Sequence, residues 1–404
     1  MHILLIHQLF IRPQDPGGTR HYEFARHLVQ RGHQVTVLAG TRSYLSGAVQ
    51  APVGRERLEP GLVVLRSRVV GGVHRSFLRR SVGFLTFLAS SLMAGGGVRG
   101  VDVVWGTSPP LTQALSAWAL GRLKGVPWVF EVRDLWPDFA VEMGVLRSPL
   151  LIRLAKGLER FLYRRADRVV VNSPGFIEPV QREGAEAGRI ALVPNGVDSA
   201  AFELEGDGAA LRAMHGLQGK FIALYAGAHG PANDLGVVLR AAQALRDDPR
   251  IVFLLVGDGM EKSALRKLAA DLRLNNLRFL PPIPKAGIPE LFGAADCGLA
   301  VLKPIPLFAT TYPNKVFDYM AAAKPVVLAI DGPIRRVVEQ AGAGIAVPPG
   351  DAQAMAQAVT RLADDPELRR QMGQQGRECV KTAFDRRQLA EQMEAVFAEL
   401  VGTR

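Results

Sequence analysis

Cysteine is scarce in this chain of 404 residues: only Cys297 and Cys379 occur, and neither belongs to a C-x-x-C pair. A disulfide framework is therefore excluded, and a reduced, cytoplasmic setting is expected. The chain also lacks any D-x-D pair, and its eight histidines do not cluster with the spacing of metal ligands. We therefore expect no metal cofactor. The first seven residues, MHILLIH, lack the basic region and cleavage site of a signal peptide and are typical of a strand.

The composition is that of a globular protein, with 48% hydrophobic and 22% charged residues. A chain of this length exceeds one ordinary core, so two domains are expected. The formal net charge is +11. An excess of positive charge favours an anionic partner, which here means a nucleoside diphosphate, a nucleic acid or an anionic membrane.

Long hydrophobic runs are absent except for residues 82–98, which carry no charge. Seventeen residues with several glycines and hydroxyl side chains are too few and too polar for a good membrane span. A buried helix is one interpretation. The other is a surface that docks on an anionic bilayer, and the two can coexist. In the docking interpretation the preceding segment supplies basic and apolar side chains, namely Arg75, Arg79, Arg80, Phe77 and Leu78.

Short apolar strands alternate with amphipathic helices along both halves of the chain. The expected strands are residues 3–6, 35–38, 63–66, 101–105, 128–132 and 169–171, then 221–225, 252–256, 277–280, 298–301, 325–329 and 344–347. This alternation predicts α/β architecture with two doubly wound parallel sheets that face a cleft. The turn-rich sequence around residue 195 marks the boundary, so the expected domains are 1–195 and 196–384. Residues 385–404 form a helix that packs back on the first domain.

Glycine-containing loops follow the first strand of each half. Gly17 and Gly18 precede a helix in the first half, and residues 227–233 (GAHGPAN) precede one in the second. Gly257 follows the next strand in the sequence Gly-Asp-Gly. Such loops let the backbone approach a diphosphate at a helix N-terminus, although a plain turn explains each one taken alone. None matches the P-loop pattern or a dinucleotide fingerprint.

Two further stretches combine charged residues with strand ends or helix starts. Residues 131–137 (EVRDLWP) close a buried strand, so Arg133 and Asp134 are expected at the carboxyl edge of the sheet, where Trp136 offers a flat face to a sugar. In the stretch 311–327, Pro313 suits the first turn of a helix. Lys315 and Asp318, three residues apart, then point into one site. A lysine at a helix N-terminus favours an anion, and a carboxylate one turn later can accept hydrogen bonds from sugar hydroxyls. For a Lys/Asp pair taken alone, however, an ion pair on a surface helix is the simpler interpretation.

The chain resembles the family-4 retaining glycosyltransferases of GT-B fold, with two Rossmann-like domains. The resemblance rests on the order of the motifs along the chain, which are Gly17-Gly18, 131–137, 194–198 (PNGVD), 227–233, 257–259 and 313–327. Within that family the chain is most similar to the capsule and O-antigen branch that includes N-acetyl-L-fucosaminyl transferases. The resemblance implies a nucleotide-sugar donor, usually linked to UDP, bound mainly by the second domain. It also implies an acceptor bound mainly by the first domain, and it implies catalysis without a metal.

The residue correspondence is uneven. Asp318 stands where the family's second glutamate holds the ribose, whereas the first glutamate falls on Thr310. The family's arginine and lysine after the first strand of the second domain fall on Ala228 and Asn233. With these two charges missing, the diphosphate is expected to be bound by Lys315, His229 and the loop amides of residues 227–230. Alternatively, first-domain arginines such as Arg20 reach it. In many relatives a His-Asp pair stands where this chain has Arg133 and Asp134.

The sequence therefore predicts a retaining glycosyltransferase that moves a sugar, an N-acetylated or deoxy hexose, from a UDP-sugar to a glycan or polyprenyl-diphosphate-linked acceptor in cell-surface polysaccharide synthesis. Its place is the inner face of the plasma membrane. Catalysis is assigned to Asp134, Arg133 and Lys315. Donor binding is assigned to Gly17, Gly18, Gly227, His229, Gly230, Gly257, Asn314, Lys315 and Asp318, and acceptor or membrane contact to Trp136, Arg75, Phe77, Arg79 and Arg80.

Two rival functions remain open at this stage. A UDP-sugar 2-epimerase-like enzyme of the same fold would release free sugar without an acceptor. A non-catalytic basic binding protein would bind oligonucleotides with a steep dependence on salt. The chain does not interleave aromatic with basic residues, so no nucleic-acid partner is expected.

Overall fold

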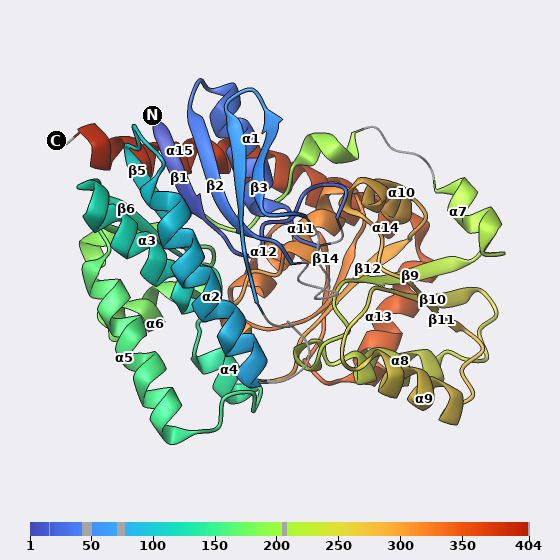
Figure 1. The fold of residues 1–404 in the computed structure, drawn as a ribbon. Coiled ribbons are helices and arrows are strands. Elements are labelled where there is room, and N and C mark those ends of the chain that lie inside the picture. Colours follow the sequence, from blue (N-terminus) through green and yellow to red (C-terminus); the bar gives the residue numbers. More distant parts are fainter. Residues whose placement is uncertain (16, 43–50, 71–76, 204–207, 403–404) are drawn as a thin grey trace. The chain divides into compact units, whose positions relative to one another are not determined.

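The computed structural model describes residues 1–15, 17–42, 51–70, 77–203 and 208–402, with the side chains of residues 77–81 left out. The chain divides into two compact units (Figure 1). Unit 1 comprises Met1–Arg12, Thr19–Pro194 and Arg387–Arg404, and unit 2 comprises Pro13–Gly18 and Asn195–Arg386. The expected strand–helix alternation is present in both units, so the predicted α/β architecture is confirmed.

Unit 1 contains an eight-stranded sheet in the order β3-β4-β2-β1-β5-β6-β7-β8. All neighbours are parallel except β3, which runs antiparallel to β4. The strands are β1 (His2–Ile6), β2 (Gln34–Gly40), β3 (Gly54–Glu59), β4 (Leu62–Ser67), β5 (Val103–Ser108), β6 (Trp128–Val132), β7 (Arg168–Val171) and β8 (Ile190–Leu192).

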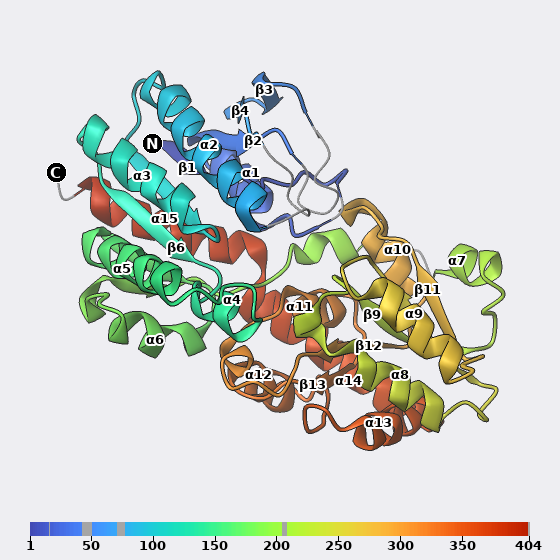
Figure 2. The same ribbon diagram turned by 60° about the horizontal axis from the view of Figure 1, so that its bottom comes forward.

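Helices cover both faces of this sheet. They are α1 (Arg20–Gln30), α2 (Phe77–Gly96), α3 (Leu111–Lys124), α4 (Asp138–Glu142), α5 (Pro149–Arg165), α6 (Ile177–Arg182) and α15 (Arg386–Gly402). Figure 2 shows α2, α3 and α5 side by side over one face. On the other side α15 joins the core of unit 1, where Phe397 packs against Trp105 of β5.

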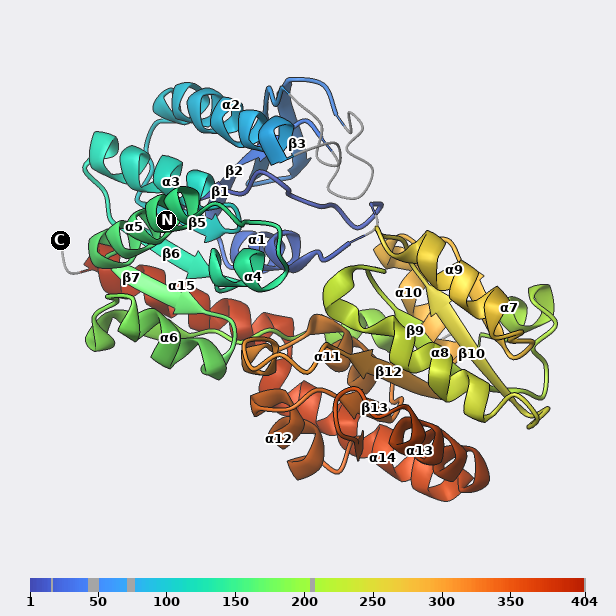
Figure 3. The same ribbon diagram turned by 90° about the horizontal axis from the view of Figure 1, so that it is seen from below.

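Unit 2 contains six parallel strands in the order β11-β10-β9-β12-β13-β14. Figure 3 labels β10, β9, β12 and β13 of this sheet. Alternate residues of each strand face opposite sides, so Ile222 and Leu224 join one core and Ala223 and Tyr225 the other. The strands are β9 (Phe221–Ala226), β10 (Ile251–Val256), β11 (Leu277–Leu280), β12 (Cys297–Val301), β13 (Val326–Ala329) and β14 (Gly344–Ala346). The helices are α7 (Ala209–Met214), α8 (Leu235–Ala244), α9 (Lys262–Asp271), α10 (Ile288–Gly293), α11 (Asn314–Ala321), α12 (Pro333–Gln340), α13 (Ala352–Asp364) and α14 (Pro366–Cys379).

The uncharged stretch 82–98 forms most of α2, and only one stripe of this helix is buried. Gly83, Phe87, Ser91 and Gly95, spaced by four residues, face the unit, and a Cβ on Gly95 would lie 2.6 Å from Leu120. The opposite side is exposed and includes apolar residues. One side of the helix formed by residues 82–98 thus belongs to the core, as the buried-helix interpretation expects, and the other side is exposed to solvent. Within the described ranges, no helix is both long and apolar enough to cross a membrane.

Candidate functional site

Two loops and one helix start meet at the carboxyl edge of the sheet in unit 2. Gly227 follows β9, Gly257 and Gly259 follow β10, and all three have positive φ values. A Cβ on Gly257 would lie 1.9 Å from the carbonyl oxygen of Gly227, and one on Gly259 would lie 2.4 Å from that of His229. The two loops therefore pack backbone against backbone, which only glycine permits at these positions.

Lys315, in the first turn of α11, reaches this pair of loops. Its Nζ donates to Tyr225 Oη at 2.8 Å and to Asn233 Oδ1 at 3.3 Å. It also lies 4.0 Å from the centre of the Tyr225 ring, and a Cβ on Gly227 would lie 3.2 Å from it. No carboxylate of a described residue pairs with this ammonium, and burial lowers the pKa of Lys315 to about 7. The protonated form of Lys315 thus has no counter-charge among the described residues.

His229 lies between the same loops and is fully buried. Its backbone N–H donates to Asp258 O at 2.8 Å, and its carbonyl accepts from Glu261 N at 2.9 Å. Both ring nitrogens lack a hydrogen-bond partner. Burial, followed by the nearby Lys262, lowers the pKa of His229 to about 4. The ring is therefore neutral at pH 7, so the expected positive charge comes from Lys315 and not from His229.

Asp318 and Lys315 contact different partners, and their sharing of one site stays a prediction. Asp318 Oδ1 accepts from Lys285 Nζ at 2.7 Å, whereas Lys315 turns toward Tyr225. The two residues are thus held separately on α11. Asn314 begins that helix, and its Oδ1 is buried without a partner.

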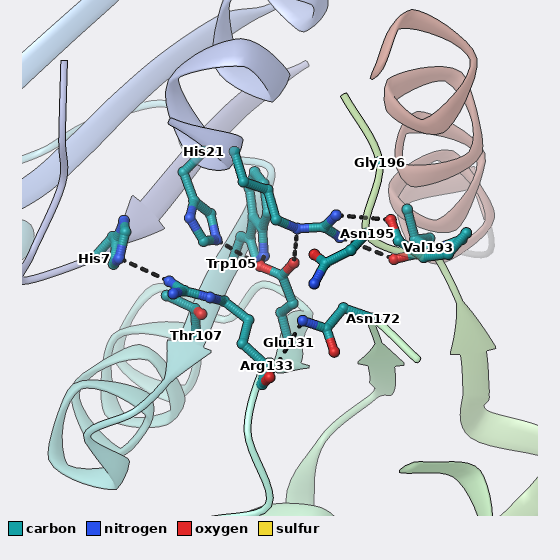
Figure 4. A network of polar contacts seen from close by, with 12 residues as sticks. His7, His21, Trp105, Thr107, Glu131, Arg133, Asn172, Val193, Asn195 and Gly196 are labelled. Carbon is teal, nitrogen blue, oxygen red and sulfur yellow. Dashed lines mark hydrogen bonds and ion pairs between the residues drawn. The ribbon is translucent and has the colours of Figure 1, made fainter. Parts of the chain in front are cut away.

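A second polar cluster lies at the carboxyl edge of the sheet in unit 1 and is centred on Glu131 (Figure 4). This fully buried carboxylate accepts from Arg20 Nε at 2.8 Å, His21 Nε2 at 2.7 Å and Trp105 Nε1 at 3.1 Å. Despite its burial, these partners, His21 foremost, hold the pKa of Glu131 well below its usual range. Arg20 also donates to the carbonyls of Val193 and Pro194. Arg20 thus contacts groups of unit 1, and its part in binding the diphosphate stays a prediction.

Arg133 and Asp134 directly follow β6, at the predicted edge of the sheet. Arg133 Nη1 donates to His7 Nε2 at 3.0 Å, and the carbonyl of Arg133 accepts from Asn172 Nδ2 at 3.2 Å. Burial raises the pKa of Asp134 to about 6, with an opposing contribution from Arg133. The two residues form no ion pair within 4 Å in the described structure, so they do not simply hold the loop together as a buried pair.

The other expected residues lie in loops or in the segment around the start of α2. Trp136 is partly exposed in the loop after β6. Gly17 and Gly18 are exposed, and a Cβ on Gly18 would meet no atom within 4 Å. Gly230 precedes a short 3₁₀ turn at Pro231–Asn233. Arg75 and the side chains of Phe77, Leu78, Arg79 and Arg80 lie outside the described part of the structure.

Sequence reasoning missed Glu131, His21 and His7 as members of a site. A signal was present for Glu131, because a carboxylate inside the apolar strand WVFEV must find buried partners. His7 and His21 carry no comparable signal, since single histidines in a chain are often ordinary core residues.

Two family models match consecutive parts of the chain. Residues 17–196 match the glycosyl transferase 4-like domain, and residues 209–379 match the glycosyl transferases group 1.

Curated relatives match over most of the chain. The probable glycosyltransferase WbjE of Pseudomonas aeruginosa is 27% identical over 289 residues, which cover 70% of each chain. The putative colanic acid biosynthesis glycosyl transferase WcaI of Escherichia coli K12 is 28% identical over 313 residues, which cover 74% of this chain and 76% of WcaI.

Solved structures match over the whole length. Sucrose-phosphate synthase from Thermosynechococcus elongatus aligns with a TM-score of 0.82 and 21% identity, covering all of both chains. Anabaena HepE, in a complex with UDP and glucose, aligns with a TM-score of 0.75 and 18% identity, covering 99% of this chain and all of HepE. At these identities the structural likeness supports the fold alone.

Proposed function

Because this chain is a group 1 glycosyltransferase of GT-B fold, we propose that it transfers an N-acetylated or deoxy hexose from a UDP-sugar to a glycan or polyprenyl-diphosphate-linked acceptor. The name of WcaI, a putative colanic acid biosynthesis glycosyl transferase, supports a place in polysaccharide synthesis. We extend this proposal to cell-surface polysaccharides, O-antigen or capsule among them. We propose UDP as the nucleotide because HepE, which shares the fold, has been solved with UDP and with UDP-glucose.

The observation that carries this proposal is Lys315. An ammonium held beside glycine loops, with a tyrosine hydroxyl and an amide as its protein partners, is prepared for an anion. A Cβ on Gly257 would clash with the carbonyl oxygen of Gly227, and one on Gly227 would lie 3.2 Å from Lys315 Nζ. The donor's diphosphate is the anion that we assign to this place, with Asn314 and the loop amides of residues 227–230 as further partners.

The proposed reaction retains the anomeric configuration. The bond between the anomeric carbon and the diphosphate oxygen breaks, and an acceptor hydroxyl oxygen attacks the same face. The hydroxyl proton passes to the leaving phosphate oxygen. No side-chain nucleophile is needed, and Lys315 stabilises the negative charge that grows on the diphosphate. Asp134 and Arg133 orient the acceptor, and Trp136 provides an apolar face for its sugar.

The direct test is mass spectrometry of products from a panel of UDP-sugars with farnesyl-diphosphate-linked N-acetylglucosamine as acceptor. The proposal expects a glycosylated acceptor and UDP. Free sugar without transfer would favour the epimerase-like alternative. Oligonucleotide binding that falls steeply with salt, together with no turnover of any donor, would favour the non-catalytic alternative.

Transfer is expected to continue in EDTA. The sequence lacks a D-x-D pair, and the described residues contain no group of three or more metal-type ligands. Positive side chains and loop amides then do the work of a metal on the leaving group. Initial rates are compared with and without EDTA. Activity that is lost in EDTA and restored by Mn²⁺ would contradict this expectation.

Asp318→Ala is expected to weaken UDP binding by about 1–3 kcal/mol, the cost of leaving a buried hydrogen-bond partner unsatisfied. We assign the ribose hydroxyls to this carboxylate, which Lys285 holds at 2.7 Å. Calorimetry with UDP measures the effect. Asp331→Ala is the control, because Asp331 is an exposed carboxylate of unit 2 paired with Arg335. Wild-type affinity in Asp318→Ala would remove Asp318 from the donor site.

We also propose that unit 1 binds the surface of an anionic bilayer. Large apolar side chains are exposed on α2 (Val82, Leu85 and Met93) and near the start of α5 (Leu150, Leu151 and Leu154). Exposed arginines, Arg147 and Arg153, accompany the leucines of α5. Apolar insertion beside cations that meet lipid phosphates is the physics of peripheral binding. Such a surface would bring the enzyme to a lipid-linked acceptor, which lies in the bilayer.

Liposome flotation tests this surface. Wild type is expected to float with anionic vesicles at low salt and less as salt rises. Changing Arg75, Arg79 and Arg80 to glutamate, or Leu150 and Leu154 to serine, is expected to reduce flotation strongly. The matched control replaces Met214 and Met260 by serine, because both are exposed apolar residues of unit 2. Equal flotation of all variants, or none by wild type, would contradict the proposal.

A further inference from the structure

The guanidinium of Arg133 is held in place by a histidine rather than by a carboxylate. His7 directly follows β1 and is 5% exposed. Its Nε2 lies 3.0 Å from Arg133 Nη1 (Figure 4). The main chain of Arg133 is fixed as well, because its carbonyl accepts from Asn172 Nδ2. Both ends of this residue are therefore restrained.

The contact determines the protonation of His7. A guanidinium only donates hydrogen bonds, so Nε2 must accept, and the neutral ring carries its proton on Nδ1. Burial, with contributions from His21 and Arg133, holds the pKa of His7 well below its usual range. His7 is thus a neutral acceptor dedicated to Arg133.

The ring of His7 is in turn fixed by the Glu131 cluster. The centres of the His7 and His21 rings lie 4.2 Å apart. His21 is anchored by its hydrogen bond to Glu131, which Arg20 and Trp105 also bind. A chain of packed and hydrogen-bonded side chains therefore runs from the core of unit 1 to the guanidinium.

Arg133 has donors left over after this contact. A guanidinium carries five N–H donors, and of the described side chains only His7 receives a hydrogen bond from it. Asp134 is the neighbouring carboxylate, but no ion pair forms between them in the described structure. A planar, oriented cation that is partly exposed and lacks a carboxylate partner matches the geometry of a phosphate.

We propose that Arg133 binds a phosphate group of a substrate and that His7 is the positioning residue that presents the guanidinium for it. This inference rests on the proposed function for its choice of substrates. The phosphate belongs either to a lipid-diphosphate acceptor or to the nucleotide of the donor. Holding an arginine in one rotamer before binding lowers the entropy that binding must overcome.

Calorimetry with two probes, farnesyl diphosphate and UDP, tests the inference. Arg133→Met is expected to weaken at least one probe about tenfold or more, the effect of losing a charge-assisted hydrogen bond. Loss confined to farnesyl diphosphate identifies the acceptor as the source of the phosphate, and loss confined to UDP identifies the donor. Arg133→Lys keeps the positive charge but loses the planar, two-pronged donor geometry of the guanidinium. Its affinity for the affected probe is expected to lie between those of wild type and Arg133→Met.

A matched pair of variants tests the role of His7. His7→Gln and His7→Met have similar shapes, but only glutamine places an accepting oxygen near the position of Nε2. Affinity for the affected probe is expected to stay within about twofold of wild type in His7→Gln and to fall in His7→Met. Thermal unfolding of both variants checks that they remain folded. A merely structural role of His7 would make their affinities equal.

Two results would overturn the inference. One is affinity for both probes within twofold of wild type in folded Arg133→Met. The other is equal affinity in His7→Gln and His7→Met. The proposed function fails independently of these results, namely if wild type binds the probes but transfers no sugar from any UDP-sugar.

Discussion

Lys315→Met is expected to lower kcat by about 10²–10³, the typical cost of removing one group that stabilises developing negative charge. Affinity for UDP is expected to fall much less. The reason is that the charge on the diphosphate grows as the glycosidic bond breaks, so the ammonium contributes more in the transition state than in the ground state. Steady-state kinetics with the donor found by the product screen measures both values.

Lys315→Arg provides the comparison, because it keeps the charge while changing the shape. It is expected to retain more turnover than Lys315→Met. The pocket formed by Tyr225 and Asn233 is fitted to a lysine, so full activity is not expected. Equal kcat in wild type and Lys315→Met would remove Lys315 from the catalytic machinery.

Glu131→Gln is expected to destabilise the protein by about 3–5 kcal/mol, the range for removing one partner from a buried ion pair. Arg20 is only 4% exposed and would lose the carboxylate that lies 2.8 Å from its Nε. The neutral amide would also have to fit three donors, from Arg20, His21 and Trp105. Denaturant unfolding of unit 1 measures the loss.

Glu178→Gln is the control for this substitution. Glu178 pairs with Arg182 on the surface of α6, where both side chains are largely exposed, and such pairs contribute little. Its stability is expected to match that of wild type within about 1 kcal/mol. Loss of similar size in the two variants would contradict the structural role assigned to Glu131.

The same cluster predicts how stability depends on pH. Burial lowers the pKa of His21 from 6.5 to about 4, so the unfolded chain binds more protons between these values. Stability is therefore expected to fall as pH drops from about 6.5 to 4. The depressed pKa of Glu131 adds to the loss as pH falls below its unfolded value. Urea unfolding across this pH range checks the direction.

Most of the parallel strands were predictable because each is a short apolar run bounded by turn residues. The parallel strand β8 was not predicted, since it has only three residues. The strand β3 was not predicted, since its sequence GRERLE has no apolar run. It lies at the edge of the sheet, antiparallel to β4 with a register shift between Arg57 and Glu59, where strands need only one neighbour. An edge strand such as β3 can therefore form without the apolar pattern by which a central strand is recognised in the sequence.

The candidate site was predictable where a residue's position in an element decides its place. Lys315 and Arg133 were found because helix starts and strand ends meet at the carboxyl edge of a sheet. The direction in which each side chain points was not predictable. Lys315 and Asp318 share a helical face by spacing, yet Lys315 contacts Tyr225 and Asp318 contacts Lys285. The charge state of His229 also depends on burial, which the sequence does not display.

The most direct test of the central claim is calorimetric titration of UDP at pH 8 in Tris and in HEPES, whose ionisation enthalpies differ. Burial lowers the pKa of unliganded Lys315 to about 7, so most of the side chain is neutral at pH 8. An anion beside it raises that pKa again. Binding is therefore predicted to take up nearly one proton in wild type and none in Lys315→Met. The same binding enthalpy in both buffers for wild type, or no binding of UDP, would contradict the assignment of the donor diphosphate to Lys315.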